Sequence, residues 1–386
     1  MNNFNFHIPT EIYFGKGEVE NLPKIIKKYG SKVLLTYGGG SIKKIGLYDK
    51  ITSLLKENNI EFVELSGIEP NPRLSTVEKG VALCRENNVD LILPVGGGST
   101  IDCSKVIAGS VHYMGSAWDI VKDSSKVTKV LPIVSVLTIA ATGSEMNAGA
   151  VISNMDTLEK LGVGHPEFRP KASILDPTYT YSVSPLNTAS GVADIMSHVF
   201  EQYFSNVEAF LQDRLSEAVL KTCIKYGKTV VEEPENYEAR ANIMWASSIG
   251  LNGILRIGKD VAWTVHPMEH QLSAYYDLTH GIGLAILTPH WMRYVLSEKT
   301  VDKFKEFGIN VWDIDKNLDK WEIAKLSIEK TENFFKELGI PMSLKEVNID
   351  ETHFEEMAVK ALAGGLENAY VPLEKEDIIK IYKASL

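Results

Sequence analysis

Hydrophobic positions in the first 180 residues alternate between short runs and longer stretches with helical spacing. The short runs, rich in β-branched and large apolar residues, predict strands at Lys32–Tyr37, Glu61–Leu65, Leu91–Val95 and Leu131–Val136. Between them, stretches such as Leu74–Asn88 place apolar residues three or four positions apart, which predicts amphipathic helices. Alternation of strands and helices is typical of α/β folds, so we expect a Rossmann-like, doubly wound parallel sheet.

The pattern changes after two proline-containing breaks, Asp176–Pro177 and Ser184–Pro185. From Asn187 onward the apolar spacing is mainly helical, in blocks such as Leu211–Tyr226, Tyr237–Asn252 and Trp321–Leu338. A chain of 386 residues is long enough for two domains, because single cores stop growing beyond ~250–300 residues. We therefore expect an α/β domain of the dinucleotide-binding kind at 1–184 and an all-α domain at 185–386.

Composition and charge exclude some classes of binding partner. The chain has 40 basic and 50 acidic residues and a net charge of −10, which opposes binding to nucleic acid or to an anionic membrane. It has no apolar run long enough to span a bilayer, and its first residues lack the pattern of an export signal. Its three cysteines are widely spaced, which indicates neither a disulfide framework nor a thiolate metal site. We expect a cytoplasmic protein that acts on a small molecule.

Two copies of the tetrapeptide GGGS, at Gly38–Ser41 and Gly96–Ser99, each follow a predicted strand and precede a predicted helix. Glycine at this place lets a phosphate approach the backbone N–H groups at the start of a helix. Neither copy fits the G-x-G-x-x-G or Walker pattern, so tight turns without a ligand stay possible. Asp102, three residues after Ser99, also predicts a capping box with Ser99 as the helix cap.

A second group of residues indicates a metal site without cysteine. Asp194 and His198 are four residues apart among apolar neighbours, so on a helix they share one buried face. Three further histidines, His266, His270 and His280, lie within fifteen residues of one another. One carboxylate and two or three imidazoles suit Fe²⁺, Zn²⁺ or Mn²⁺. Ion pairs and core histidines without a metal remain the simpler alternative.

The same segment supports a different class of function. Residues His266 to His270 read HPMEH, which fits the H-x-x-E-H motif of zinc peptidases, with Glu269 as the base that activates water. A peptidase would leave the two glycine turns and the Asp194/His198 pair unexplained. A metal-binding protein without catalytic activity would not need the glycine turns either.

Taken together, these motifs resemble the iron-containing, metal-dependent alcohol dehydrogenases, in particular their butanol dehydrogenase and broad aldehyde reductase branch. The resemblance is carried along most of the chain by TYGGGSIKKIG, GIEPNPR, VGGGSTIDCSK, LTIAATGSEMNAGAVIS, LDPTYTY, GVADIMSHVFEQYF, YEARANIMWASS and HPMEHQLSAYYDLTHGIGLAIL. It implies a dinucleotide-binding domain, a helical metal-bearing domain, a catalytic cleft between them, and a homodimer.

The resemblance also implies a role for individual residues. One divalent ion, Fe²⁺ or Zn²⁺, would be bound by Asp194, His198, His266 and His280, and His270 would be a catalytic residue that relays a proton. The cofactor-binding residues would be Gly38, Gly39, Gly40, Ser41, Asn71, Gly97, Gly98, Ser99, Asp102, Thr138, Thr142, Ser144, Asn147, Lys160 and Tyr179. Lys105 and Glu145 would be structural.

The implied reaction is hydride transfer between NAD(P)H and short- to medium-chain aldehydes such as butanal. A polyol enzyme like glycerol dehydrogenase, or a lyase like dehydroquinate synthase, is the alternative within the same superfamily. Relatives strict for NAD carry an Asp at the first glycine turn, where this chain has glycines with Ser41, Lys43 and Lys44 nearby. We therefore expect NADPH to be used at least as well as NADH.

Overall fold

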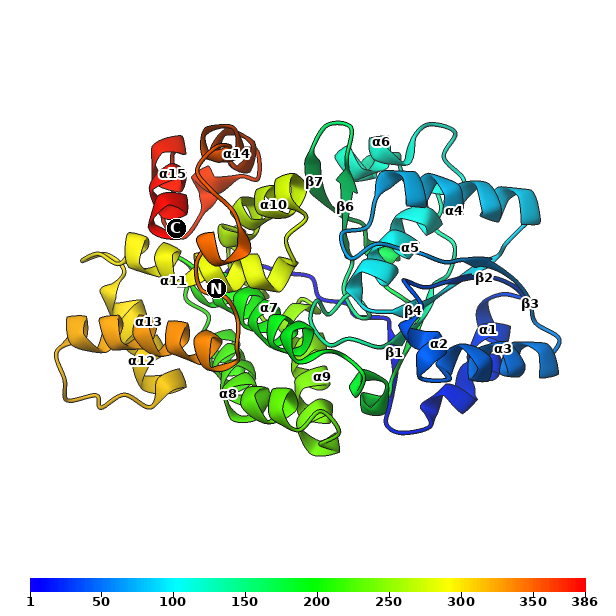
Figure 1. The fold of residues 1–386 in the computed structure, drawn as a ribbon, viewed down its shortest axis with the longest axis horizontal. Coiled ribbons are helices and arrows are strands. Elements are labelled where there is room, and N and C mark those ends of the chain that lie inside the picture. Colours follow the sequence, from blue (N-terminus) through cyan, green and yellow to red (C-terminus); the bar gives the residue numbers. More distant parts are fainter. The chain divides into compact units, whose positions relative to one another are not determined.

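The structure is a computed structural model that describes residues 1–386 in full. The chain forms two compact units, an α/β unit of residues 7–183 and 234–252 and a helical unit of residues 1–6, 184–233 and 253–386 (Figure 1). None of the helices combines the length and the apolar character needed to cross a membrane.

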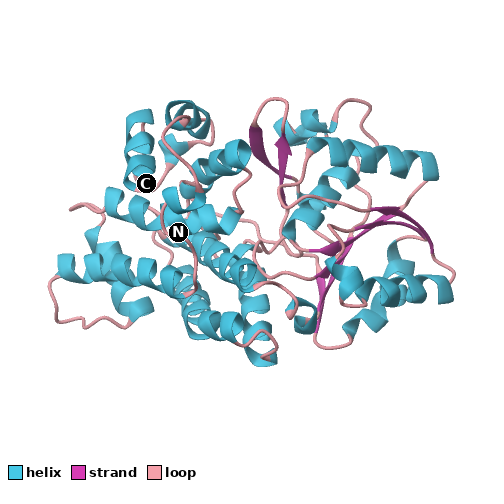
Figure 2. Ribbon diagram, in the orientation of Figure 1, coloured by secondary structure: helices cyan, strands magenta, loops and turns pink.

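The α/β unit is built on a six-stranded sheet in the order β1-β8-β5-β4-β2-β3, and every pairing in it is parallel (Figure 2). Its strands are β1 (Glu11–Phe14), β2 (Lys32–Thr36), β3 (Glu61–Leu65), β4 (Leu91–Gly96), β5 (Val134–Leu137) and β8 (Ala172–Leu175). This confirms the predicted doubly wound parallel sheet, and all four predicted strands take part in it. The pattern did not predict β1 and β8, which have four residues each.

Both faces of this sheet are covered by helices, which explains its uninterrupted apolar strands. Successive side chains of a strand point to opposite faces: in β4, Leu91 and Leu93 belong to one apolar core and Ile92 belongs to the other. The longer helices of the unit are α1 (Leu22–Tyr29), α3 (Leu47–Glu57), α4 (Leu74–Asn87), α5 (Gly98–Ser110) and α6 (Ala117–Lys122). An antiparallel hairpin, β6 (Gly149–Asn154) and β7 (Glu159–Gly164), completes the unit.

One helix differs from the predicted division at residue 185. Helix α9 (Tyr237–Leu251) lies in the α/β unit, although the surrounding sequence belongs to the helical one. Its Met244 is buried in an apolar cluster with Leu137 and Leu175, the last residues of β5 and β8. Ser248 of α9 also donates a hydrogen bond of 2.5 Å to the buried Glu145 carboxylate. A helical pattern shows that a helix forms, but it does not show which core that helix joins.

The helical unit is arranged around α7 (Pro185–Tyr203), which is buried from Thr188 to Tyr203. The other helices are α8 (Phe210–Glu232), α10 (Val265–Tyr276), α11 (His280–Val295), α12 (Val301–Trp312), α13 (Lys320–Glu337), α14 (Phe354–Leu362) and α15 (Lys375–Ala384). Helices α8 and α11 pack directly on α7 (Figure 1). A Cβ atom at Gly281 would lie 2.1 Å from the Ser190 carbonyl oxygen, so only glycine allows α11 to approach α7 this closely.

Candidate active site

Three helices of the helical unit bring the four predicted metal ligands together. Asp194 and His198 are one turn apart on α7, His266 lies in the first turn of α10, and His280 is the first residue of α11. Potential ligand atoms of the first three all lie within 4.8 Å of one another. His280 Nε2 lies 3.8 Å from Asp194 Oδ1, so the fourth residue adjoins the same group.

The surroundings of these side chains fit a divalent cation. Asp194, His198 and His266 are buried, and His266 Nε2 has no hydrogen-bond partner. A buried polar atom without a partner costs about 1–3 kcal/mol, and such atoms are rare in folded proteins. A metal ion bound by His266 Nε2 would remove this cost. One carboxylate with three imidazoles is also a ligand set that Fe²⁺ and Zn²⁺ accept.

The pKa values of the two buried histidines are shifted in opposite directions. Burial holds the pKa of His198 well below its ordinary value, and the neighbouring His266 and His280 lower it further. His198 is therefore neutral, which is the form that binds a metal. At His266, burial opposes protonation, but the carboxylates of Glu201, Asp194 and Glu269 together outweigh burial, so the pKa is raised and a metal ion would displace this proton. The Glu201 carboxylate forms an ion pair with Nδ1 at 3.2 Å, which leaves Nε2 as the atom for a ligand.

Glu201 is a residue of this site that the sequence did not single out. Its carboxylate accepts hydrogen bonds from the backbone N–H groups of Thr264, Val265 and His266 at 3.1, 2.7 and 3.0 Å. It thereby caps α10, whose N-cap residue Thr264 makes no side-chain cap of its own. The signal was present, because residues 194, 198 and 201 follow the i, i+4, i+7 spacing of one helix face.

Glu269 holds His280 in a similar way. Its buried carboxylate contacts His280 Nδ1 and accepts a hydrogen bond of 2.5 Å from the Ser273 hydroxyl. His280 therefore directs Nε2 towards Asp194. A peptidase base would have to face water at a site formed by His266 and His270, whereas Glu269 is engaged with His280 and Ser273. This arrangement disfavours the peptidase interpretation.

His270 lies one turn after His266 on α10 and adjoins the predicted ligand set. Its ring centre is 6.3 Å from that of His266 and 5.5 Å from that of His280. Unlike the buried His198 and His266, it is partly exposed. Its position suits the predicted role next to the ligands, in contact with substrate or cofactor.

The predicted cofactor residues follow the carboxyl ends of the parallel strands in the α/β unit. Gly38 to Ser41 follow β2, Asn71 follows β3, Gly97 to Asp102 follow β4, Thr138 to Asn147 follow β5, and Tyr179 follows β8. Lys160 is the exception and lies on β7 of the hairpin. Because the carboxyl ends of parallel strands meet at one edge of a sheet, these residues gather where doubly wound folds bind dinucleotides.

At the second glycine turn the predicted capping box is wrong. Helix α5 begins at Gly98 with Gly97 as its N-cap and has no side-chain cap. Ser99 therefore lies inside the first turn, where its hydroxyl donates to the Pro70 carbonyl oxygen. Asp102 accepts hydrogen bonds from the Ser144 hydroxyl at 2.5 Å and from the Val151 N–H at 2.9 Å. Asp102 thus fastens the segment after β5 to α5 instead of capping the helix.

Lys105 strengthens the same attachment. Its fully buried ammonium donates hydrogen bonds to Ser144 Oγ at 2.8 Å, Asn147 Oδ1 at 2.9 Å and the Gly149 carbonyl at 2.7 Å. Burial lowers the pKa of Lys105 to about 8. Ser144 and Asn147, two predicted cofactor contacts, are therefore held in place by Lys105, in agreement with the structural role expected for this lysine.

Next to the first glycine turn, the side chain of Lys43 packs on two tyrosine rings. The Lys43 ammonium lies 5.2 Å from the ring centre of Tyr37 and 4.7 Å from that of Tyr48. The two tyrosine hydroxyls donate to Glu64 at 2.7 and 2.8 Å. The Glu64 carboxylate is thus engaged with tyrosines, and a lysine is placed three residues after Gly40.

Comparison with known proteins places this chain in a family. Residues 9–177 match the family model described as iron-containing alcohol dehydrogenase, and residues 188–386 match the model of the Fe-containing alcohol dehydrogenase family, C-terminal. The chain is 60% identical over 388 residues to NADH-dependent butanol dehydrogenase A of Clostridium acetobutylicum, with complete coverage of both chains.

Two further proteins show the range of the likeness. NADPH-dependent aldehyde reductase YqhD of Escherichia coli is 41% identical over 323 residues, which cover 83% of this chain and 82% of the reductase. The crystal structure of NADH-dependent butanol dehydrogenase A of Thermotoga maritima superposes with a TM-score of 0.95 at 38% identity, and covers 100% of this chain and 99% of that one.

Proposed function

The chain belongs to the iron-containing alcohol dehydrogenase family, and from this premise we propose that it interconverts short- to medium-chain aldehydes, such as butanal, and their alcohols at a divalent metal. The metal would be bound by Asp194, His198, His266 and His280. The observation that carries this proposal is the convergence of the four side chains, with His266 Nε2 buried and without a hydrogen-bond partner. The chain is an oxidoreductase that acts on alcohols, so the proposal concerns its site and its substrate.

In this proposal the α/β unit binds the nicotinamide cofactor and the helical unit binds the metal. When bound, the nicotinamide exchanges hydride with the carbonyl carbon and the divalent metal polarises the carbonyl oxygen, a contribution of several kcal/mol. Glu201 and Glu269 keep His266 and His280 in the orientation that binds the ion. His270, partly exposed beside them, would give the proton to the product oxygen and take it back in the reverse direction.

The metal itself is proposed to be Fe²⁺ or Zn²⁺, because the ligand set lacks thiolate and contains three imidazoles. The names of the two family models favour iron. Metal analysis of protein purified without oxygen would identify the ion. We further propose, from the family resemblance, that the enzyme is a cytoplasmic homodimer, which light scattering in solution would test for the oligomeric state.

The substrate class is tested by comparing butanal with glycerol as substrates of the metal-loaded enzyme. We expect rapid NAD(P)H oxidation with butanal and, in the opposite direction, much slower NAD(P)⁺ reduction with glycerol than with butanol. A preference for glycerol would favour the polyol alternative, and turnover of neither class would contradict the proposed function.

For the cofactor, we propose that NADPH is used at least as well as NADH. The names of the relatives include both cofactors. The proposal is supported by the first glycine turn, where Gly38 to Gly40 provide no carboxylate and Lys43 carries a positive charge. An ammonium at this place attracts the 2′-phosphate that distinguishes NADPH, whereas an acidic side chain would repel it.

Replacing Gly39 by Asp is expected to lower kcat/KM with NADPH by roughly 10- to 100-fold, equivalent to about 1.4–2.8 kcal/mol, with a much smaller effect for NADH. A Cβ atom at Gly39 meets no other atom within 4 Å, so the variant can keep the fold. Gly39→Ala is the matched control for added bulk without charge. Equal losses with both cofactors, or a strong NADH preference of the wild type, would contradict this assignment.

A further inference from the structure

An indole side chain adjoins the predicted metal ligands. The ring centre of Trp263 lies 4.9 Å from that of His266 and 6.0 Å from that of His198, with the rings inclined by 63° and 88°. The two histidines are buried, whereas Trp263 is partly exposed, as are His270 and His280. Trp263 therefore contacts the ligand rings and keeps part of its own surface exposed.

Trp263 lies in a connecting segment, 258–263, that leads into α10 and is fixed upstream by several polar contacts. The Lys259 ammonium donates to the Gln202 carbonyl at 2.9 Å and forms an ion pair with Asp213. The Ser205 hydroxyl donates to the Asp260 carbonyl at 2.8 Å. Segment 258–263 is thus attached to the end of α7, the helix that carries Asp194 and His198.

The chain is also fixed immediately downstream of Trp263. Glu201 accepts the N–H groups of the three residues that follow it, Thr264 to His266. Trp263 therefore lies between two attachments to α7, one at Lys259 and one at Glu201. A side chain held on both sides next to the ligands is placed reproducibly, as a wall of a binding site requires.

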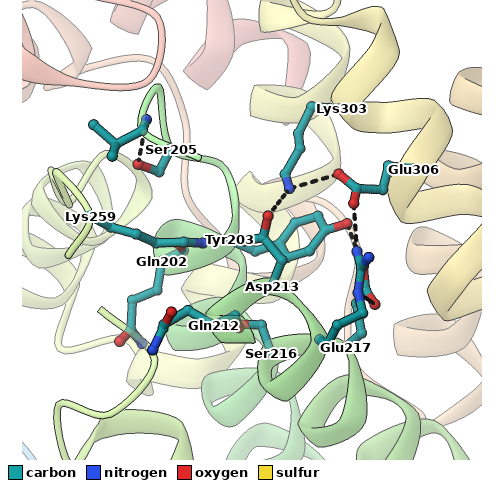
Figure 3. Close-up of polar contacts among 12 residues, drawn as sticks. Gln202, Tyr203, Ser205, Gln212, Asp213, Ser216, Glu217, Lys259, Lys303 and Glu306 are labelled. Atoms are coloured by element: carbon teal, nitrogen blue, oxygen red, sulfur yellow. Dashed lines mark hydrogen bonds and ion pairs between the residues drawn. The ribbon is translucent and has the colours of Figure 1, made fainter. Parts of the chain in front are cut away.

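The ion pair of Lys259 belongs to a larger network of charged residues. In this network Lys303 can serve as a control for Lys259. Lys303 donates to Asp213 at 2.7 Å and to Glu306 at 2.9 Å, and its ammonium lies 3.9 Å from the ring centre of Tyr203 (Figure 3). Lys259 and Lys303 share the Asp213 carboxylate, but of the two only Lys259 belongs to segment 258–263. Loss of either lysine leaves Asp213 with the other cation.

From these contacts we propose that Trp263 is a specificity-determining residue, which packs against the alkyl chain of the aldehyde, and that Lys259 is a positioning residue that holds Trp263 in place. This inference rests on the proposed function. An indole face provides a large apolar contact area, so each further methylene of the substrate gains contact with it. A polyol gains no binding free energy from this contact, because its hydroxyl groups would give up hydrogen bonds to water where they face the ring. The site therefore selects unbranched, unsubstituted aldehydes with chains longer than that of propanal.

The test compares kcat and KM for propanal, butanal and hexanal in Trp263→Ala, Trp263→Phe and the wild type. We expect Trp263→Ala to lose at least 10-fold in kcat/KM for hexanal, mainly through KM, and less than 3-fold for propanal. Trp263→Phe should keep most of the chain-length preference. Metal content, measured on the same samples, should stay at the wild-type value. Trp245→Ala removes a 41% exposed indole that contacts Phe14 and should change none of these quantities.

Lys259→Met should reproduce the Trp263→Ala pattern in weaker form, with a rise in KM for hexanal of 3- to 10-fold, whereas Lys303→Met should leave the chain-length profile unchanged. A merely structural role of the network would instead give both lysine variants the same loss of thermal stability and an unaltered profile. If Trp263→Ala keeps the wild-type profile, or loses activity equally for all three aldehydes, the inference is wrong while the proposed function stands. A metal-loaded wild type that reduces none of the aldehydes overturns both.

Discussion

The His266→Ala variant is expected to bind no stoichiometric metal and to lose at least about three orders of magnitude in kcat/KM with butanal. His266 provides the buried Nε2 atom that has no hydrogen-bond partner, and its ring lies between those of His198 and His280. Polarisation of the carbonyl oxygen by a metal contributes several kcal/mol, and a loss of about 4 kcal/mol corresponds to roughly 1,000-fold in rate. Metal analysis and steady-state kinetics on the same preparation measure both effects.

The matched control for this variant is His112→Ala. His112 is an exposed histidine of the α/β unit, so its replacement should change neither the metal content nor the rate. A His266→Ala protein with the wild-type metal content and rate would show that the predicted ligand set is wrong.

The second large effect is expected for Glu201→Ala, which removes a residue that contacts no substrate. Three backbone N–H groups at the start of α10 lose their acceptor, and His266 loses the carboxylate 3.2 Å from its Nδ1 atom. Loss of a helix cap and of hydrogen bonds to a charged group should lower the free energy of unfolding by about 2–4 kcal/mol. Loss of the carboxylate that orients a ligating histidine typically lowers metal affinity by roughly 10- to 100-fold.

Urea unfolding of the metal-free protein and competition with a chelator separate the two consequences of Glu201→Ala. Glu208→Ala, at an exposed position soon after the end of the same helix, should alter neither. If the Glu201→Ala protein is less stable but binds metal as tightly as the wild type, Glu201 caps α10 and has no role in metal binding.

Much of the fold follows from the spacing of apolar residues, because a strand buried on both faces leaves an uninterrupted apolar run. Strands β2 and β4 were predicted almost to the residue for this reason, and β3 was predicted as closely although it is an edge strand that is only partly buried. Strands β1 and β8, of four residues each, were not predicted, whereas β5 is as short but lies in a longer apolar run, Leu131–Leu137. The assignment of α9 to the α/β unit depends on Met244 packing against the strand ends, and no local pattern encodes that contact.

The metal site was accessible from sequence because its ligand types are rare and closely spaced. Asp194 and His198 are separated by one helical turn, so local geometry brings them together, whereas His266 and His280 are brought near them by the packing of α7, α10 and α11. Glu201 shares the helix-face spacing of Asp194 and His198, but its role was missed because its partners, the N–H groups of α10, lie more than sixty residues away and belong to the backbone. A backbone donor has no signature in a sequence.

The capping box at Ser99 and Asp102 is a motif that was predicted from the sequence but does not form. Ser99 and Asp102 have the right spacing, but α5 begins two residues earlier than that motif requires. The structure uses Asp102 to bind Ser144 and Val151, residues that a helix-capping motif does not include. Spacing alone could not reveal that these tertiary contacts replace the local one.

The central claim is that activity depends on one metal ion held by Asp194, His198, His266 and His280, and a metal titration tests it most directly. Protein stripped with a chelator and kept free of oxygen would be titrated with Fe²⁺, and in parallel with Zn²⁺, while reduction of butanal by NADPH is followed. We predict no activity in the stripped protein, a linear rise that ends at one equivalent per chain with at least one of the two metals, and no response in His266→Ala. Full activity in the metal-free wild type would contradict the account.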